Sequence, residues 1–150
     1  MGAPISALTA ARHMCERSDW TLTNLELQKM LYLAHMMFMG KNGGERLVTG
    51  NFEAWDYGPV HPQVYREAKA FGSGPVRYLF TASRVHDPAR EAMLDEAYDD
   101  LSKVSAGQLV NITHWKDGAW ARNYRPNQRG IVIPDPHILD EFKRRFPAAA

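Results

Sequence analysis

With 150 residues and 45% apolar side chains, the chain has the size and composition of one ordinary domain that closes its core without disulfides. Eighteen basic and seventeen acidic side chains leave a net charge of +1, which excludes a strong field drawing the protein to nucleic acid or anionic membranes. There is no apolar leader, no run approaching the roughly 20 residues that span a bilayer, and Cys15 is the single cysteine. We therefore expect one domain, residues 1–150 with a core at about 5–146, in a reducing cytoplasm.

The first forty residues predict two helices. Apolar side chains recur at close to helical spacing over residues 5–19, with Cys15 on the apolar side as a small buried hydrophobe. Thr23 and Glu26 then have the form of a capping box, in which each side chain bonds the other residue's backbone N–H. This box predicts a helix that runs to Gly40.

The helix predicted after Thr23 is apolar on both sides, which requires that it be covered twice. Four of the seven methionines also lie within it, between Met30 and Met39. Methionine fills irregular gaps in a core, and it also makes adaptable surfaces for protein partners. The pattern is typical of either the central helix of the domain or a helix whose second face awaits a partner.

Turn-rich and strand-like stretches follow between Gly40 and Phe71. Residues 47–49 predict a short strand, with Gly50-Asn51 as a tight connection into a second strand at 52–57. Gly58-Pro59 is expected to end that ladder, because proline lacks a backbone N–H. Pro62 then suits the first turn of a helix reaching Phe71.

The second half of the chain predicts three more helices and one strand. Asp87-Pro88 opens a helix with one buried face, Ser105 opens a short helix through a capping box with Gln108, and Asp135-Pro136 caps the last. Residues 130–133 read as a β-branched strand that Pro134 cuts off. The expected fold is α+β, mainly helical, with a small two- or three-stranded antiparallel sheet.

No catalytic or cofactor motif is present: the chain lacks a phosphate loop, a dinucleotide fingerprint, a zincin helix and a CxxC pair. Its six histidines are scattered at spacings that match no metal template, so we expect no metal and no cofactor. The basic run 143–145 suits a helix C-terminus, and we expect no nucleic-acid binding. An enzyme with His61 or His114 as general base stays a less favoured alternative, since no nucleophile accompanies either.

Two groups of large rings favour protein binding over chemistry. One lies in FEAWDYGPVHPQVY, residues 52–65, and the other in THWKDGAW, residues 113–120. Such rings are common in cores and in binding hot spots alike. The glycine and prolines of the first group favour an interface, because a rigid loop loses less entropy when it binds.

These stretches, with LTNLELQKMLYLAHMMFMG before them and GIVIPDPHILDEFKRRF after them, resemble the Panacea domain of SocA-like antitoxins over about residues 5–146. The resemblance implies a mostly helical cytoplasmic protein, bacterial or phage, that is not an enzyme and that binds and neutralises a cognate protein toxin. It further implies a role as a proteolytic adaptor that delivers the toxin to ClpXP. A chaperone-like protein that sequesters the toxin without a protease is the alternative.

On this basis we expect a partner-binding surface at eleven residues: Tyr32, Met36, Met39, Trp55, Tyr57, Pro59, His61, Tyr65, His114, Trp115 and Trp120. We expect Gln28 in the interior, where a buried amide needs backbone partners. The end of the chain, with Ala149 and Ala150, resembles the small apolar tails that ClpX-type unfoldases read, although a frayed terminus explains it as well.

Overall fold

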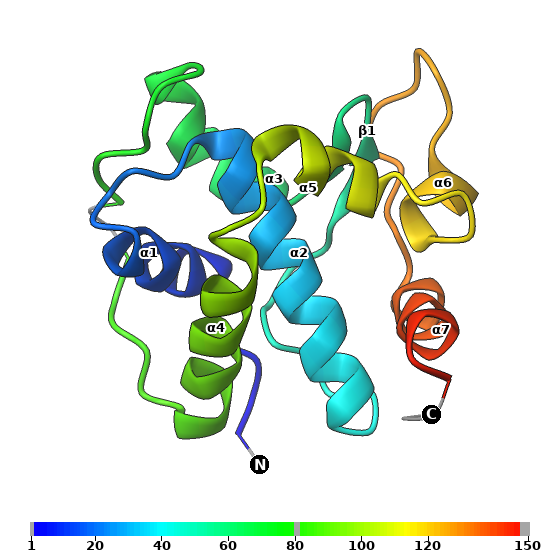
Figure 1. Ribbon diagram of the computed structural model, residues 1–150, viewed down its shortest axis with the longest axis horizontal. Coiled ribbons are helices and arrows are strands. Elements are labelled where there is room, and N and C mark those ends of the chain that lie inside the picture. The colour runs from blue at the N-terminus through cyan, green and yellow to red at the C-terminus, as the bar shows by residue number, and fades with distance from the viewer. Residues whose placement is uncertain (1, 80–81, 148–150) are drawn as a thin grey trace.

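The computed structural model describes residues 2–79 and 82–147, so Ala149 and Ala150 lie outside the described residues. Helix α2 (Asn24–Lys41) runs through the middle of the molecule and is contacted from several sides by the other helices (Figure 1). Its capping box between Thr23 and Glu26 is formed as predicted. Because α2 buries side chains all around its axis, it is the central helix of the fold and not one with an uncovered face.

The described residues form six further helices, and five of them contact α2. Helix α1 (Ala7–Arg17) packs on α4 (Pro88–Leu101), and both contact α2. Helix α3 (Pro62–Ala68) continues into a 3₁₀ turn (Lys69–Phe71), as Pro62 predicted. The remaining helices are α5 (Ala106–Thr113), α6 (Ala119–Asn123) and α7 (Asp135–Arg145). Helices α3, α5 and α7 also contact α2. The sequence did not predict α6, and Asp135 is the first residue of α7, not its cap, which is Pro134.

The sheet consists of strands β1 (Glu53–Trp55) and β2 (Gly58–Val60), which pair antiparallel with Ala54 opposite Pro59. The prediction that Gly58-Pro59 ends the ladder was wrong. The Pro59 carbonyl accepts a hydrogen bond from Lys29 on α2, so the backbone of Pro59 faces away from β1 and its missing N–H removes no ladder bond. Gly58 is required here, because its φ is +117° and a Cβ would lie 2.8 Å from Lys29 Cε.

A third segment pairs with the other edge of β1. The Ile131 carbonyl accepts from the Ala54 N–H at 2.9 Å, and the Ile133 N–H donates to the Phe52 carbonyl at 2.8 Å. This is an isolated antiparallel bridge and not a full strand. The predicted fold class, α+β and mainly helical with a small antiparallel sheet, is confirmed.

The hairpin predicted at Gly50-Asn51 is absent from the described structure, because Val48 pairs elsewhere. Val48 forms a parallel bridge with Ile5, supported by N–H···O bonds of 3.0 and 2.9 Å from Ile5 to Leu47 and from Thr49 to Ile5. A partner more than forty residues away therefore replaces the local one.

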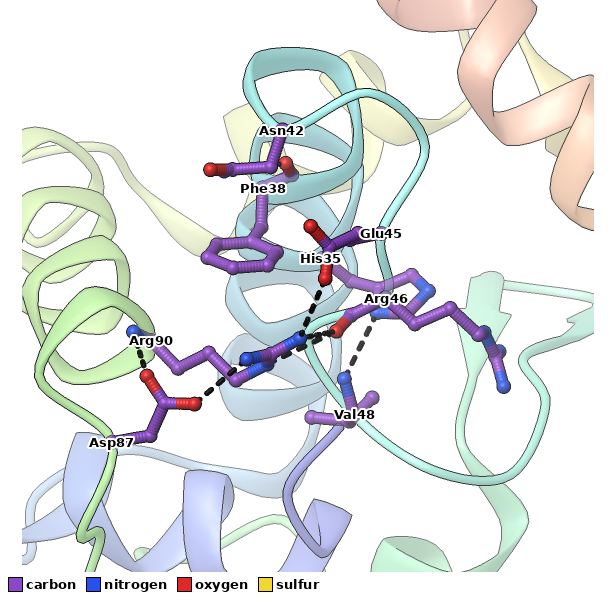
Figure 2. Close-up of polar contacts among 8 residues, drawn as sticks. All are labelled: His35, Phe38, Asn42, Glu45, Arg46, Val48, Asp87 and Arg90. Carbon is purple, nitrogen blue, oxygen red and sulfur yellow. Dashed lines mark hydrogen bonds and ion pairs between the residues drawn. The ribbon is translucent and has the colours of Figure 1, made fainter. Parts of the chain in front are cut away.

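A buried arginine fastens α4 to the loop after α2 (Figure 2). Arg90 is 2% exposed; its Nη1 donates to Asp87 Oδ2 at 2.7 Å, and its Nε and Nη2 donate to the Arg46 carbonyl at 3.1 and 2.8 Å. Its guanidinium lies 4.6 Å from the centre of the Phe38 ring. The loop is also held by His35, whose Nδ1 accepts from the Val48 N–H.

Two single-residue predictions agree with the core. Cys15 is fully buried, and burial raises the pKa of its thiol to about 12, so it packs as a small hydrophobe. Gln28 is also buried, and its Oε1 accepts from the His61 N–H at 2.8 Å. Within the described residues, no helix is long and apolar enough to cross a membrane.

Candidate protein-binding face

Aromatic side chains from three separate segments meet around the β1–β2 hairpin, the end of α5 and helix α6, which Figure 1 shows beside one another. Trp120 lies at the centre. Its ring stacks on His114 with centroids 3.8 Å apart and on Tyr124 with centroids 4.6 Å apart. Its Nε1 donates to the Trp55 carbonyl at 2.7 Å, which ties α6 to the hairpin.

The hairpin adds further rings to this group. Trp55 packs edge-on against Tyr65 of α3, with centroids 4.7 Å apart, and both are half-buried. Tyr57, at the tip, is 69% exposed, the most exposed large apolar side chain among the described residues. We call the set Trp55, Tyr57, Tyr65, His114, Trp120 and Tyr124 the aromatic face.

Tyr124 was missed by the sequence analysis, since no motif marks it. Its hydroxyl donates to Asp56 Oδ1 at 2.5 Å, so it joins the end of α6 to the hairpin turn. This bond to a carboxylate raises the pKa of the Tyr124 hydroxyl. Trp115, which was predicted, lies at the start of the α5–α6 connection, and the Arg145 guanidinium lies 4.7 Å from its ring centre.

Five of the eleven predicted residues lie in the interior and not at the surface. Tyr32, Met36, Met39 and His61 are each at most 2% exposed, and Pro59 is buried in β2. The Tyr32 hydroxyl donates to Glu141 Oε1 at 2.7 Å, and His61 Nε2 lies 2.8 Å from the Thr49 carbonyl. Tyr32 and His61 also pack edge-on against Phe52, the residue before β1.

A buried lysine lies directly beneath the aromatic face. Lys29 of α2 is 1% exposed, and its Nζ donates to the Pro59 carbonyl at 3.1 Å. Burial lowers its pKa to about 8. Burial also lowers the pKa of His114; a hydrogen bond with the Tyr57 backbone acts in the opposite direction, and the charge of Lys29 lowers it further. Lys29 therefore bonds the hairpin through Pro59 and lies close enough to His114 for its charge to lower the pKa of that histidine.

Replacing this lysine by a neutral side chain of similar length is expected to stabilise the protein. Its folded pKa of about 8 lies below its ordinary value of 10.5, so the charged form costs about 3 kcal/mol at pH 7. The lost hydrogen bond offsets about 1 kcal/mol of this. Lys29→Met should therefore raise the free energy of unfolding by about 2 kcal/mol at pH 7, measured by urea unfolding.

The pH dependence of this difference in the free energy of unfolding tests the lowered pKa of Lys29. Between pH 8 and 10.5 the unfolded state binds more protons than the folded state, so the native protein gains stability as pH rises. The advantage of methionine should shrink to under about 0.5 kcal/mol at pH 9.5. Lys103→Met, at an exposed position, is the control and should show no such trend. A gain at Lys29→Met that is equal at both pH values would contradict the assignment.

Comparison with known proteins places these features in a family. The model of the family described as Antitoxin SocA-like, Panacea domain, matches residues 27–121. Antitoxin SocA of Caulobacter vibrioides (strain NA1000 / CB15N) is 35% identical over 143 residues, covering 83% of this chain and 74% of that protein. The chain belongs to the SocA-like Panacea-domain antitoxins. No solved structure matches it.

The residues matched by the family model include almost all of the candidate site. Residues 27–121 of this Panacea domain run from the start of α2 into α6, and they contain all eleven residues predicted from the sequence. They also contain Lys29 and the whole β1–β2 hairpin. Of the aromatic face, Tyr124 alone falls outside the matched residues.

Proposed function

We propose that this Panacea-domain protein is an antitoxin that neutralises a cognate protein toxin by direct binding through the aromatic face. Membership of the SocA-like family supports the antitoxin role. The observation that carries the choice of surface is the stack of His114, Trp120 and Tyr124 against a hairpin whose tip presents Tyr57. Large rings held in place by neighbours are the usual anchors of protein interfaces.

The face is ordered before a partner arrives. The bond from Trp120 to the Trp55 carbonyl and the bond from Tyr124 to Asp56 fix both edges of the stack. Lys29 holds the hairpin from beneath through Pro59. Because these side chains lose little freedom on binding, more of the contact energy appears as affinity.

Tyr57 is the side chain to test first, because it is exposed and its loss leaves the core intact. Tyr57→Ala should weaken toxin binding by about tenfold, measured by titration calorimetry with the purified toxin, and should reduce rescue of cells that express it. Tyr78→Ala is the matched control, since Tyr78 is 56% exposed but lies beside Trp20, outside the face. If the unmodified chain, Tyr57→Ala and Tyr78→Ala bind the toxin with equal affinity, the interface lies outside the aromatic face.

Neutralisation through the protease is a second step of the proposal. The antitoxin then acts as an adaptor that delivers the bound toxin to ClpXP in the cytoplasm. The half-life of the toxin in cells should be short when both proteins are present and should lengthen when ClpX is deleted, with rescue lost. Rescue that persists without ClpX would favour sequestration by a chaperone-like protein.

We infer a role without catalysis for the two histidines considered as general bases. His61 is 2% exposed and engages the Thr49 carbonyl, and His114 is stacked on Trp120. Both contacts suit packing. Covalent alteration of the toxin, seen as a mass change after incubation with the antitoxin, would contradict this inference.

A further inference from the structure

A histidine and two carboxylates that are far apart in the sequence converge on the side of the molecule where α1 meets α4. His13 comes from α1, and Glu91 and Asp95 come from consecutive turns of α4. Each offers one ligand atom, and these three atoms lie within 4.8 Å of one another. All three residues are half-buried, so the cluster is anchored yet open to solvent.

The charges around this cluster leave one carboxylate uncompensated. Arg12 and Arg84 both lie beside Glu16, at 3.5 and 3.6 Å. Arg17 donates to Asp95 Oδ1 at 2.7 Å and also pairs with Asp99. The Glu91 carboxylate has no hydrogen bond and no ion pair with any described residue, although it faces the same cluster.

The bond between His13 and Asp95 brings two ligands together in advance. His13 Nε2 lies 2.7 Å from Asp95 Oδ1, so the two atoms need to separate by about 0.6 Å to reach the distance of about 3.3 Å between ligand atoms around a tetrahedral ion bound at 2.0–2.1 Å. A surface pocket of about 320 Å³, lined in part by His13 and Glu91, gives access. If a cation binds Asp95 and displaces Arg17 from it, Arg17 still forms its ion pair with Asp99.

We propose that His13, Glu91 and Asp95 form a binding site for a divalent cation of the Zn²⁺ type. Imidazole is a ligand that Zn²⁺ prefers and that Mg²⁺ and Ca²⁺ do not, and two carboxylates neutralise the charge of the ion. Three protein ligands leave the fourth position to water. The bound ion joins α1 to α4, on a different part of the surface from the aromatic face.

The test uses the untagged full chain, freed of metal with EDTA, dialysed, and titrated with ZnCl₂ in a calorimeter. We expect saturable binding of one equivalent, a rise in melting temperature with added Zn²⁺, and no such rise with Mg²⁺. Glu91→Gln and His13→Asn should each weaken binding by at least about tenfold. Asp100→Asn, an exposed carboxylate on the same helix, should bind Zn²⁺ as the unmodified chain does.

Glu91→Gln keeps the test independent of folding. Because the Glu91 carboxylate has no hydrogen bond or ion pair with a described residue and only its favourable place in the first turn of α4 is lost, the melting temperature of Glu91→Gln in EDTA should lie within about 3 °C of that of the unmodified chain. Absence of saturable Zn²⁺ binding, or equal Zn²⁺ affinity in Glu91→Gln, would overturn the proposal. An equal rise in melting temperature with Mg²⁺ would also overturn the proposal, because a site with a histidine ligand should prefer Zn²⁺ to Mg²⁺.

Discussion

Arg90→Met is expected to lower the free energy of unfolding by about 3 kcal/mol, because the substitution removes a buried charge and leaves its partners unpaired. The Arg46 carbonyl loses two donors, and Asp87 loses its ion pair while keeping its cap on the Arg90 N–H (Figure 2). Methionine can replace the packing on Phe38 but not the hydrogen bonds. The melting temperature should fall by about 6–12 °C in a calorimetric scan.

Arg84→Met is the matched control for this effect. Arg84 is largely exposed, and its pair with Glu16 is at 3.6 Å, so its loss should change stability by under about 0.5 kcal/mol. Arg90→Lys should fall between the two, because lysine keeps the charge but cannot donate in the same fork. If Arg90→Met unfolds no earlier than Arg84→Met, Arg90 does not hold α4 in place.

Glu141→Ala is expected to cost about 4 kcal/mol, since Glu141 is a buried carboxylate that joins three helices. It is 1% exposed, and its Oε1 accepts from the Tyr32 hydroxyl at 2.7 Å and from the Ala119 N–H at 3.0 Å. Its Oε2 pairs with Arg145 at 2.8 Å. Alanine leaves all three donors without this acceptor, and urea unfolding measures the loss.

The same carboxylate links the stability of the protein to the aromatic face, the surface that we propose binds the toxin. Because Glu141 accepts from the first residue of α6, its loss also loosens the helix that carries Trp120, and toxin affinity should fall with stability. Glu141→Gln keeps one acceptor and should cost less than alanine. Glu67→Ala, at an exposed position of α3, should cost under about 0.5 kcal/mol. Equal stability of Glu141→Ala and Glu67→Ala would refute the account of α6.

Local signals in the sequence predicted most of the helices. The capping boxes at Thr23 and Ser105 and the cap at Asp87 each begin a helix where expected, because these bonds form within four residues of the chain. The apolar residues on both sides of α2 predicted that both sides are covered, but they did not show whether the domain core or a partner covers the second side. The surrounding helices decide that question.

The features that the sequence did not reveal depend on distant partners. Helix α6 has five residues, and the acceptor for its first N–H is Glu141, 22 positions later. The parallel bridge from Val48 to Ile5 has no local signature. The sequence analysis did not single out Arg90, because its acceptor, the Arg46 carbonyl, lies 44 positions away in the chain.

The candidate site shows the same division. The ring residues of two motifs led us to predict that Trp55, Tyr57, Tyr65, His114 and Trp120 belong to one partner-binding surface. In the structure these five residues lie together in the aromatic face. Tyr124 joins them only because α6 stacks it on Trp120. Tyr32, Met36 and Met39 have the composition of a binding surface, yet the helices packed on α2 bury them.

Hydrogen–deuterium exchange of the antitoxin with and without its toxin tests the central claim most directly. Slower exchange on binding is predicted for residues 53–66 and 113–124, which carry the aromatic face, with little change over α1 and α4. Protection confined to α1 and α4, with the hairpin and α6 unaffected, would contradict the account.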